Sequence, residues 1–471
     1  MTSYDFTRRA FVGAAAAAAA GFASPAAAFA KRRKLKPSDR VNVAAIGAGG
    51  MGASNMSKLT SQNIVALADV DFDHVNRSLR DRTGAIPPER QELKAAYDKA
   101  ERFSDYRRMF DKLGNKIDAV VIATPDHHHA VAAHMAMERG IHVYVQKPLT
   151  YTVREGRVLL DLARKNKLVT QMGNQGHSGD DGRRVVELIR GGGIGRVSEV
   201  HVWTNRPMWP QGVPKPADQP KPASLDWDVW LGPANVQWGY HPDYAHFNWR
   251  GWVPFGVGAL GDMGAHLIDF PFWALEPGLP TRVETRHSPW GGDTNFWDGK
   301  PPLLLTSYPL ATMTNYEFGN AKNGPLKMIW YDGGLMPPTP RNMPEGARMD
   351  PGGGVLFVGD QGMLMHETYG LKPTLIGEGV AERAAAIPQS LPRIQDGMAG
   401  HEMNWIRAIR GEEKISSPFD YAVPLNETMI LGMVALRAEQ AIDYDGAASR
   451  ITNALDANQY LDRQYRKGWE L

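Results

Sequence analysis

Residues that could move a proton are grouped in the stretch 258–269, GALGDMGAHLID. Asp262 and His266 are four residues apart, so they share one face if this stretch is a helix. A carboxylate beside an imidazole suits general-base chemistry, because it can orient the ring that accepts the proton. The spacing alone leaves a capping aspartate and a packed histidine as the alternative.

Lys147 offers a second kind of chemistry. It directly follows Gln146 and the apolar run 141–145, and Pro148 comes next. A lysine held between a strand end and a proline can polarise a substrate oxygen. Without a neighbouring nucleotide site, the same residue would be a solvated surface lysine.

A third motif, TPDHHH at 124–129, also follows an apolar run. Three adjacent histidines suggest a metal ion. We expect no metal, because neighbours in an extended segment point in different directions and no spaced carboxylate partner is evident. Thr124 and Pro125 are instead expected beside a cofactor.

The element that must position these groups begins with the apolar run 41–46, which is typical of a buried parallel strand. Gly47, Gly49 and Gly52 follow with G-x-G-x-x-G spacing. They permit a tight turn, a close approach of backbone to a pyrophosphate, and close packing of the next helix. The expected cofactor contacts therefore include Gly47, Gly49, Gly50, Met51, Gly52, Asp69, Thr124, Pro125 and Lys147.

Asp69 indicates which dinucleotide is bound. It follows a second apolar run, 64–68, at the place where a carboxylate meets the adenosine ribose. A carboxylate there repels a 2′-phosphate, so the sequence predicts NAD rather than NADP. Asp71 is the alternative carboxylate for this role.

Apolar runs at 117–124, 141–145 and 168–172 alternate with helical stretches at 130–139 and 153–165, as in βαβ units. Ligands bind outside the carboxyl ends of such strands, so residues 124–129 and 146–148 should face the cofactor. We expect an α/β chain with an NAD-binding Rossmann domain over 41–172 and a substrate domain over 173–450. The tail 451–471 is expected to be a surface arm.

Near the start of the second domain, the stretch 194–203 begins as a loop and then alternates apolar and polar residues. This alternation is typical of a strand in an antiparallel sheet covered on one face. Further strands are expected at 326–331 and 355–358, and helices at 401–410 and 425–441. Ten of the thirteen tryptophans lie between Trp203 and Trp297. They either pack together or line a sugar-binding cleft.

Composition narrows the class of protein. A chain of 471 residues requires two or more domains. Its net charge of +2 gives no reason to expect nucleic acid as a partner. The absence of cysteine excludes disulfides, thiolate metal sites and a cysteine nucleophile.

The N-terminus predicts a compartment. Arg8 and Arg9 precede an alanine-rich stretch that ends at the small-x-small pattern 28–30, which is typical of a twin-arginine export signal over 1–30. The stretch is too short and too weakly apolar for a membrane anchor. We expect a periplasmic protein whose basic arm, 31–40, covers the adenosine of an NAD bound before export.

Together, the glycine turn, Thr-Pro-x-x-x-His, Lys-Pro and Asp-x-Gly-x-His resemble the Gfo/Idh/MocA family, which includes glucose–fructose oxidoreductase. The resemblance covers residues 40–275. It implies NAD(P)-dependent sugar or polyol oxidation, and a second α/β domain with a large, open, mostly antiparallel sheet.

By this resemblance Lys147 polarises the reacting oxygen, His266 exchanges the hydroxyl proton and Asp262 supports both. His129 matches the histidine of the cofactor motif. One departure is Gln146, where the family usually has glutamate. That change removes a charge that would favour a protonated lysine. The expected substrate contacts are Asn174, Gln175 and His177.

We therefore expect an exported, NAD-dependent oxidoreductase of a sugar or glycoside, with a carbohydrate substrate, no nucleic-acid or membrane partner, and a homo-oligomeric assembly. A glycosidase or lyase of the same family, which oxidises the sugar transiently, is the alternative. A non-catalytic sugar-binding protein would not need Lys147, Asp262 and His266 together.

Overall fold

The computed structural model describes residues 35–288 and 306–471. The predicted export signal, 1–30, and the first part of the predicted arm lie outside these residues. Within the described part, no helix has the length and apolar character that crossing a bilayer requires.

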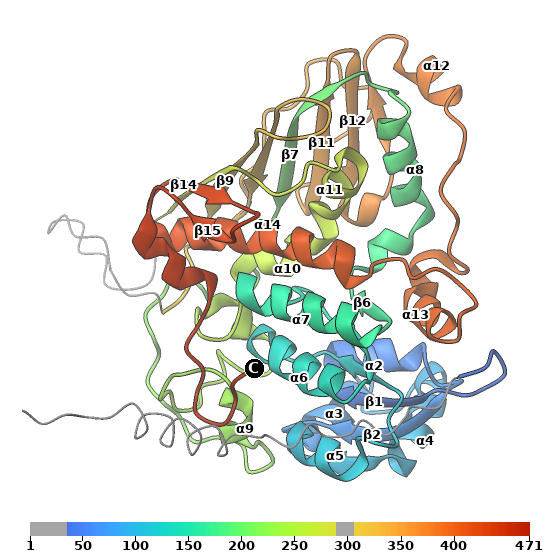
Figure 1. The fold of residues 1–471 in the computed structure, drawn as a ribbon, viewed down its shortest axis with the longest axis vertical. Coiled ribbons are helices and arrows are strands. Elements are labelled where there is room, and N and C mark those ends of the chain that lie inside the picture. Colours follow the sequence, from blue (N-terminus) through green and yellow to red (C-terminus); the bar gives the residue numbers. More distant parts are fainter. Residues whose placement is uncertain (1–34, 289–305) are drawn as a thin grey trace, which may run out of the picture. The chain divides into compact units, whose positions relative to one another are not determined.

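The N-terminal domain is a six-stranded parallel sheet in the order β3-β2-β1-β4-β5-β6, the Rossmann order expected from the sequence (Figure 1). The central strands β1, β2 and β4 are mostly apolar, as expected for a parallel sheet whose two faces are both covered by helices. The elements are β1 (Asn42–Ile46), α2 (Gly50–Ser57), β2 (Asn63–Ala68), α3 (Phe72–Ser78), α4 (Pro88–Lys99), β3 (Glu101–Phe103), α5 (Tyr106–Leu113), β4 (Ala119–Ile122), α6 (Asp126–Glu138), β5 (His142–Val145), α7 (Val153–Asn166) and β6 (Thr170–Met172).

The second sheet has nine strands in the order β13-β12-β11-β7-β10-β9-β8-β14-β15. Only β7 and β10 pair in parallel; the other pairs are antiparallel, as expected. Its strands are β7 (Val197–Thr204), β8 (Arg282–His287), β9 (Thr312–Phe318), β10 (Leu326–Tyr331), β11 (Gly353–Gly359), β12 (Gly362–Glu367), β13 (Thr374–Ile376), β14 (Ile442–Asp445) and β15 (Arg450–Ile451).

Helices connect this sheet to the first domain. α14 packs against α7, α10 and β8, so it joins the two sheets (Figure 1). The helices of this part are η1 (Gln175–Ser178), α8 (Asp180–Arg190), α9 (Trp227–Leu231), η2 (Asn248–Gly251), α10 (Gly258–Leu267), α11 (Asp269–Leu275), η3 (Thr368–Gly370), α12 (Val380–Ala385), η4 (Gly397–Gly400), α13 (His401–Ile409), α14 (Phe419–Ala438) and η5 (Leu455–Leu461).

Three sequence predictions need correction here. The helix after β4 begins at Asp126 and not at 130, because Pro125 has the extended conformation of an N-cap. The three histidines therefore lie in the first turn of α6 and not in an extended segment. α14 begins six residues before the predicted helix, since it continues through Pro424.

Two later parts of the chain pack more closely into the structure than expected. Trp405 and Ile406 on α13, assigned to the second domain, complete the core beneath β1 and β2 of the first. The tail 451–471 is not a surface arm, because Ile451, Leu461 and Trp469 are buried. Apolar side chains in the tail gain more from packing than from exposure.

Candidate active site

The glycine turn after β1 has the geometry that its spacing predicts. Gly47 has a φ of +77°, and a Cβ atom there would lie 2.6 Å from the carbonyl oxygen of Ala123. A Cβ at Gly52 would lie 1.8 Å from the carbonyl oxygen of Gly47, so α2 can approach the strand only with glycine. At Gly50 no atom lies within 4 Å of the position of such a Cβ, so space is open above the turn.

Asp69 lies at the end of β2 and holds this turn. Its carboxylate accepts hydrogen bonds from the backbone N–H groups of Ala48 (2.8 Å) and Gly49 (3.3 Å). Burial raises the pKa of Asp69 to about 6, against the opposing effect of these N–H donors. Asp71 does not take the ribose role. It is fully buried, caps α3 through the N–H of His74 and contacts His246.

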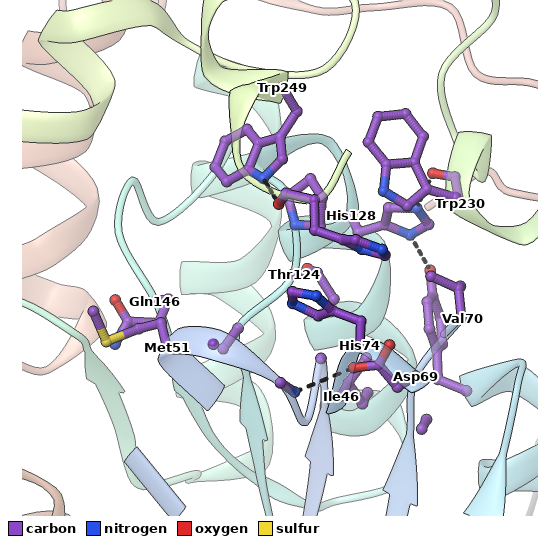
Figure 2. Close-up of a pocket in the computed structure, with 18 of the residues that line it drawn as sticks. Ile46, Met51, Asp69, Val70, His74, Thr124, His128, Gln146, Trp230 and Trp249 are labelled. Carbon is purple, nitrogen blue, oxygen red and sulfur yellow. Dashed lines mark hydrogen bonds between the residues drawn. The ribbon is translucent and has the colours of Figure 1, made fainter. Parts of the chain in front are cut away.

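A pocket opens at the carboxyl ends of the parallel strands, with an empty volume of about 1220 Å³ that includes its mouth. Figure 2 shows Ile46 and Asp69 on one side of it and the rings of Trp230 and Trp249 on the other. Its lining includes Gly47, Gly49, Gly50, Met51, Asp69, Thr124, Pro125, Gln146 and Lys147. A glycine cradle, a carboxylate at the end of β2 and this volume fit a dinucleotide.

The far wall of the pocket comes from a covering segment, residues 225–255. Its tryptophans pack on one another and on Tyr244 and Phe255, which favours the packing alternative for most of them. Trp230 and Trp249 also line the pocket. The predicted arm does not cover the pocket with its described part, 35–40. Arg410 instead donates to the carbonyl oxygens of Pro37 and Asp39.

The covering segment is fastened on both sides. His246 contacts the Asp71 carboxylate at 3.0 Å and stacks on His74 at 3.9 Å between ring centroids. Arg466 of the tail pairs with Asp228 at 2.7 Å. Trp469 lies beneath the guanidinium of Arg107, 3.7 Å from its carbon to the ring centroid.

The histidines of α6 contact carbonyl oxygens of the backbone through their ring nitrogens. His127 and His128 both contact the carbonyl oxygen of Trp230, so they anchor the covering segment. The His129 ring lies between the carbonyl oxygens of Pro148 (2.7 Å) and Thr124 (2.9 Å). His129 is absent from the pocket lining and positions the two motifs that do line it. No group of three metal-ligating side chains occurs in the described ranges.

Lys147 and Asp262 form the centre of the site. The ammonium nitrogen of Lys147 donates to the Asp262 carboxylate at 2.9 Å and to its backbone carbonyl at 2.7 Å. Arg250 donates to the same carboxylate oxygen at 2.9 Å, and Arg206 lies 3.7 Å from the other. These cations keep the pKa of Asp262 well below its usual range, although burial opposes them.

His266 lies one turn after Asp262 on α10 but makes no hydrogen bond with it in the described structure. The Asp–His pair expected from the spacing is therefore wrong, because the Asp262 carboxylate turns toward Lys147 and Arg250. The Nδ1 atom of His266 is buried and meets no hydrogen-bond partner in the part of the chain that the structure describes. Burial, with the nearby charge of Lys147, lowers the pKa of His266 to about 3, so its imidazole is neutral.

The three predicted substrate contacts are not gathered in the pocket. Gln175 donates to the hydroxyl of Tyr144 at 3.2 Å. His177 is buried, paired with Asp269 at 3.0 Å. Asn174 remains a candidate, since both polar atoms of its side chain are buried without a hydrogen-bond partner in the described residues.

Gln146 belongs to a buried hydrogen-bond network that requires an amide at this position. Its amide donates to Asn55 at 2.9 Å, and Asn55 donates to the carboxylate of Glu402 on α13 at 2.6 Å. A glutamate at 146 could not donate this bond and would bring a second carboxyl group toward a buried one. Burial already raises the pKa of Glu402.

No motif in the sequence marks Arg206, Arg250, Glu402 or the pocket face of the covering segment as functional. Arg250 lies in a Trp-Arg-Gly sequence with no spacing that marks a site. Only the clustering of aromatic residues hinted that this region faces a ligand.

Comparisons with known proteins agree with this geometry. Residues 41–174 match the "Oxidoreductase family, NAD-binding Rossmann fold", and 194–285 match the "Oxidoreductase family, C-terminal alpha/beta domain", both of the Gfo/Idh/MocA type. A Glycosyl hydrolase family 109 protein of Saccharopolyspora erythraea is 29% identical over 214 residues, 41% of this chain and 45% of the relative.

Levoglucosan dehydrogenase of Pseudarthrobacter phenanthrenivorans is 28% identical over 195 residues, 40% of this chain and 42% of the relative. These alignments span less than half of the curated relatives. Among solved structures, WlbA dehydrogenase from Bordetella pertussis, in complex with NADH and UDP-GlcNAcA, has a TM-score of 0.58 at 14% identity, over 86% of this chain and 98% of that chain.

An inositol dehydrogenase homologue from Azotobacter vinelandii, complexed with NADH and myo-inositol, has a TM-score of 0.51 at 16% identity, over 88% and 99% of the two chains. At such identities these structures establish the fold. The family matches, the strand order and the glycine cradle agree that this chain belongs to the Gfo/Idh/MocA family of NAD-binding oxidoreductases.

Proposed function

We propose that this protein is an exported oxidoreductase that oxidises or reduces a sugar or glycoside with a tightly held NAD. The proposal rests on Lys147, which lines the dinucleotide pocket, bonds Asp262 and lies near enough to His266 to lower the pKa of its imidazole. The levoglucosan and inositol dehydrogenases among its relatives support a carbohydrate substrate.

The chain's own residues supply polarisation and proton transfer, and bound NAD supplies hydride chemistry. A lysine ammonium has three N–H donors, and Asp262 accepts from two directions, through its carboxylate and its carbonyl. The third N–H is available to polarise a substrate oxygen. A neutral His266 is ready to take the hydroxyl proton as general base.

Assay of the purified protein with a panel of sugars tests this function. Reduction of the bound nucleotide, followed by its absorbance, should occur with at least one sugar and disappear in Lys147→Ala. Nucleotide reduction that survives this substitution unchanged would contradict the assigned role.

Tight retention of NAD is supported by the covering segment and its fastenings to Asp71, His74 and Arg466. An enzyme outside the cytoplasm has no dependable supply of NAD, so hydride taken from one substrate must pass to a second substrate, a later intermediate or an external acceptor. Dialysis followed by assay without added nucleotide should leave activity intact. Activity that returns only in proportion to added NAD would make NAD an ordinary cosubstrate.

Export is proposed from Arg8 and Arg9 together with the alanine-rich stretch that follows. Replacing both arginines by lysine preserves charge while removing the twin-arginine motif. The variant should accumulate in the cytoplasm and the parent chain in the periplasm on cell fractionation. Equal periplasmic amounts of the variant and the parent would contradict twin-arginine export. A separate measurement, light scattering of the exported protein, tests the expected homo-oligomer.

A second candidate function is an NAD-dependent glycosidase, favoured by the relatives named as family 109 glycosyl hydrolases. Such an enzyme releases an aglycone without net reduction of the nucleotide. A chromogenic glycoside incubated with no external acceptor separates the two functions. Continued release over many turnovers indicates the glycosidase, and a single stoichiometric reduction indicates the oxidoreductase.

A further inference from the structure

Three cations converge on the single carboxylate of Asp262. Lys147 and Arg250 bond it at 2.9 Å each, and Arg206 lies 3.7 Å away. All three are substantially shielded, with side-chain exposures of 12% for Lys147, 18% for Arg250 and 27% for Arg206.

Neighbouring ionisable groups do not balance this charge. Asp126 is buried beside Arg250 and Lys147, and burial raises its pKa to about 8, so it is mostly protonated at neutral pH. His129 and His266 are neutral, because burial lowers their pKa values to about 4 and about 3. Among the described residues, Asp262 is therefore the ionised carboxylate that all three cations share, and the chain itself supplies no further negative charge to pair with two of them.

The arginines also retain unused donors. Arg250 donates from Nε to Asp262 and from Nη1 to the carbonyl oxygen of Phe247. Arg206 donates from Nη1 to Asn205. In the described chain, the Nη2 atoms of Arg206 and Arg250 have no hydrogen-bond acceptor. Trp249, 4.1 Å from the guanidinium carbon of Arg250, helps to hold that side chain in place.

We propose that the substrate is an anionic sugar, whose carboxylate or phosphate group binds Arg206 and Arg250 beside Lys147. The sugar part of this inference rests on the proposed function. The anionic part rests on the charge of the site. A guanidinium presents paired donors that match either anion, whereas a neutral hydroxyl would leave the excess charge unpaired.

Calorimetric titration of the NAD-loaded protein tests the inference without requiring turnover. The probes are D-glucuronate, D-glucose 6-phosphate and D-glucose. At least one acid should bind roughly 10–100-fold more tightly than glucose, the range for a hydrogen bond between charged groups. The tighter of the two acids identifies the anion.

Arg206→Gln should remove most of this preference, because it should weaken binding of the acid far more than binding of glucose. Arg206→Lys, which keeps the charge, should retain part of the preference for the acid. It also serves as a control in case Arg206→Gln fails to fold. Arg286→Gln is the matched control, because Arg286 is 71% exposed on β8 and, within residues 35–288 and 306–471, pairs with Glu284 alone. Its preference should equal that of the parent.

The inference is overturned if glucose binds as tightly as both acids, if none of the three binds, or if Arg206→Gln leaves the preference intact. Preferential binding of an acid that never reduces the nucleotide would support the anion site and count against the proposed oxidoreductase. Equal reduction by charged and neutral sugars would support the oxidoreductase and reject the anion site.

Discussion

Asp126 gives a test of the electrostatics in the site through protein stability. Its side chain is 2% exposed, one oxygen accepts from the N–H of Val257 at 2.9 Å, and the other is buried without a partner. Burial raises its pKa from 3.8 to about 8, despite the nearby charges of Arg250 and Lys147. The native protein therefore holds a proton on Asp126 that the unfolded chain releases above pH 4.

The sign follows from proton binding. Between pH 4 and pH 8 the native state binds more protons than the unfolded state, so the free energy of unfolding falls as the pH rises. Each pH unit in this window costs up to about 1.4 kcal/mol. Asp126→Asn keeps the shape and the neutral charge, and an amide neither loses nor gains a proton here. Relative to the parent, the variant should gain up to about 4 kcal/mol between pH 5 and pH 8.

Urea unfolding of parent and variant at half-unit pH intervals measures this difference. Asp161→Asn, an exposed change on α7, is the matched control and should track the parent. Glu187→Gln should have the opposite effect, because this variant should become less stable than the parent as the pH rises. Hydrogen bonds from Arg393 and nearby backbone lower the pKa of Glu187 to about 2, so removing its carboxylate lowers the free energy of unfolding most above pH 4. If Asp126→Asn parallels the parent from pH 5 to pH 8, Asp126 is already ionised and the charge count of the site is wrong.

Four further outcomes are expected. His266→Ala should lower turnover about 10²–10⁴-fold and leave the nucleotide content unchanged. The control His134→Ala on α6 should change neither quantity. Normal turnover in His266→Ala would show that His266 takes no part in the reaction. Lys147→Ala should act similarly, and Lys147→Arg should not restore activity, because a planar guanidinium cannot replace a compact ammonium; rescue in a steady-state assay would refute this. Denatured parent protein should release NAD, and Asp69→Asn should bind relatively more NADP by chromatography; mainly NADP in the parent would refute the assignment. Trp469→Ala should release NAD faster in a dialysis time course, because the tail loses its packing on Arg107; an unchanged rate would show that the tail does not retain the nucleotide.

Local patterns were sufficient for the nucleotide domain. A buried strand, a glycine turn and a helix are adjacent in sequence, so their geometry depends on residues that can be read together. The strand order, the φ of Gly47 and the position of Asp69 agree with that interpretation. Asp69 lines the pocket at the end of β2, whereas Asp71 is buried and caps α3, so the assignment of the ribose contact to Asp69 stays a prediction.

Sequence alone thus determined the family and the cofactor domain, and it named three candidate catalytic side chains, since each lies in a short motif. Tertiary structure decided their partners. Asp262 bonds Lys147, 115 residues away, rather than its helical neighbour His266. Arg250 and the covering segment reach the pocket through packing of aromatic side chains, and periodicity carries no information about such contacts. The charge of the site, and with it the expected anionic substrate, exists only once burial and distance set which groups are ionised.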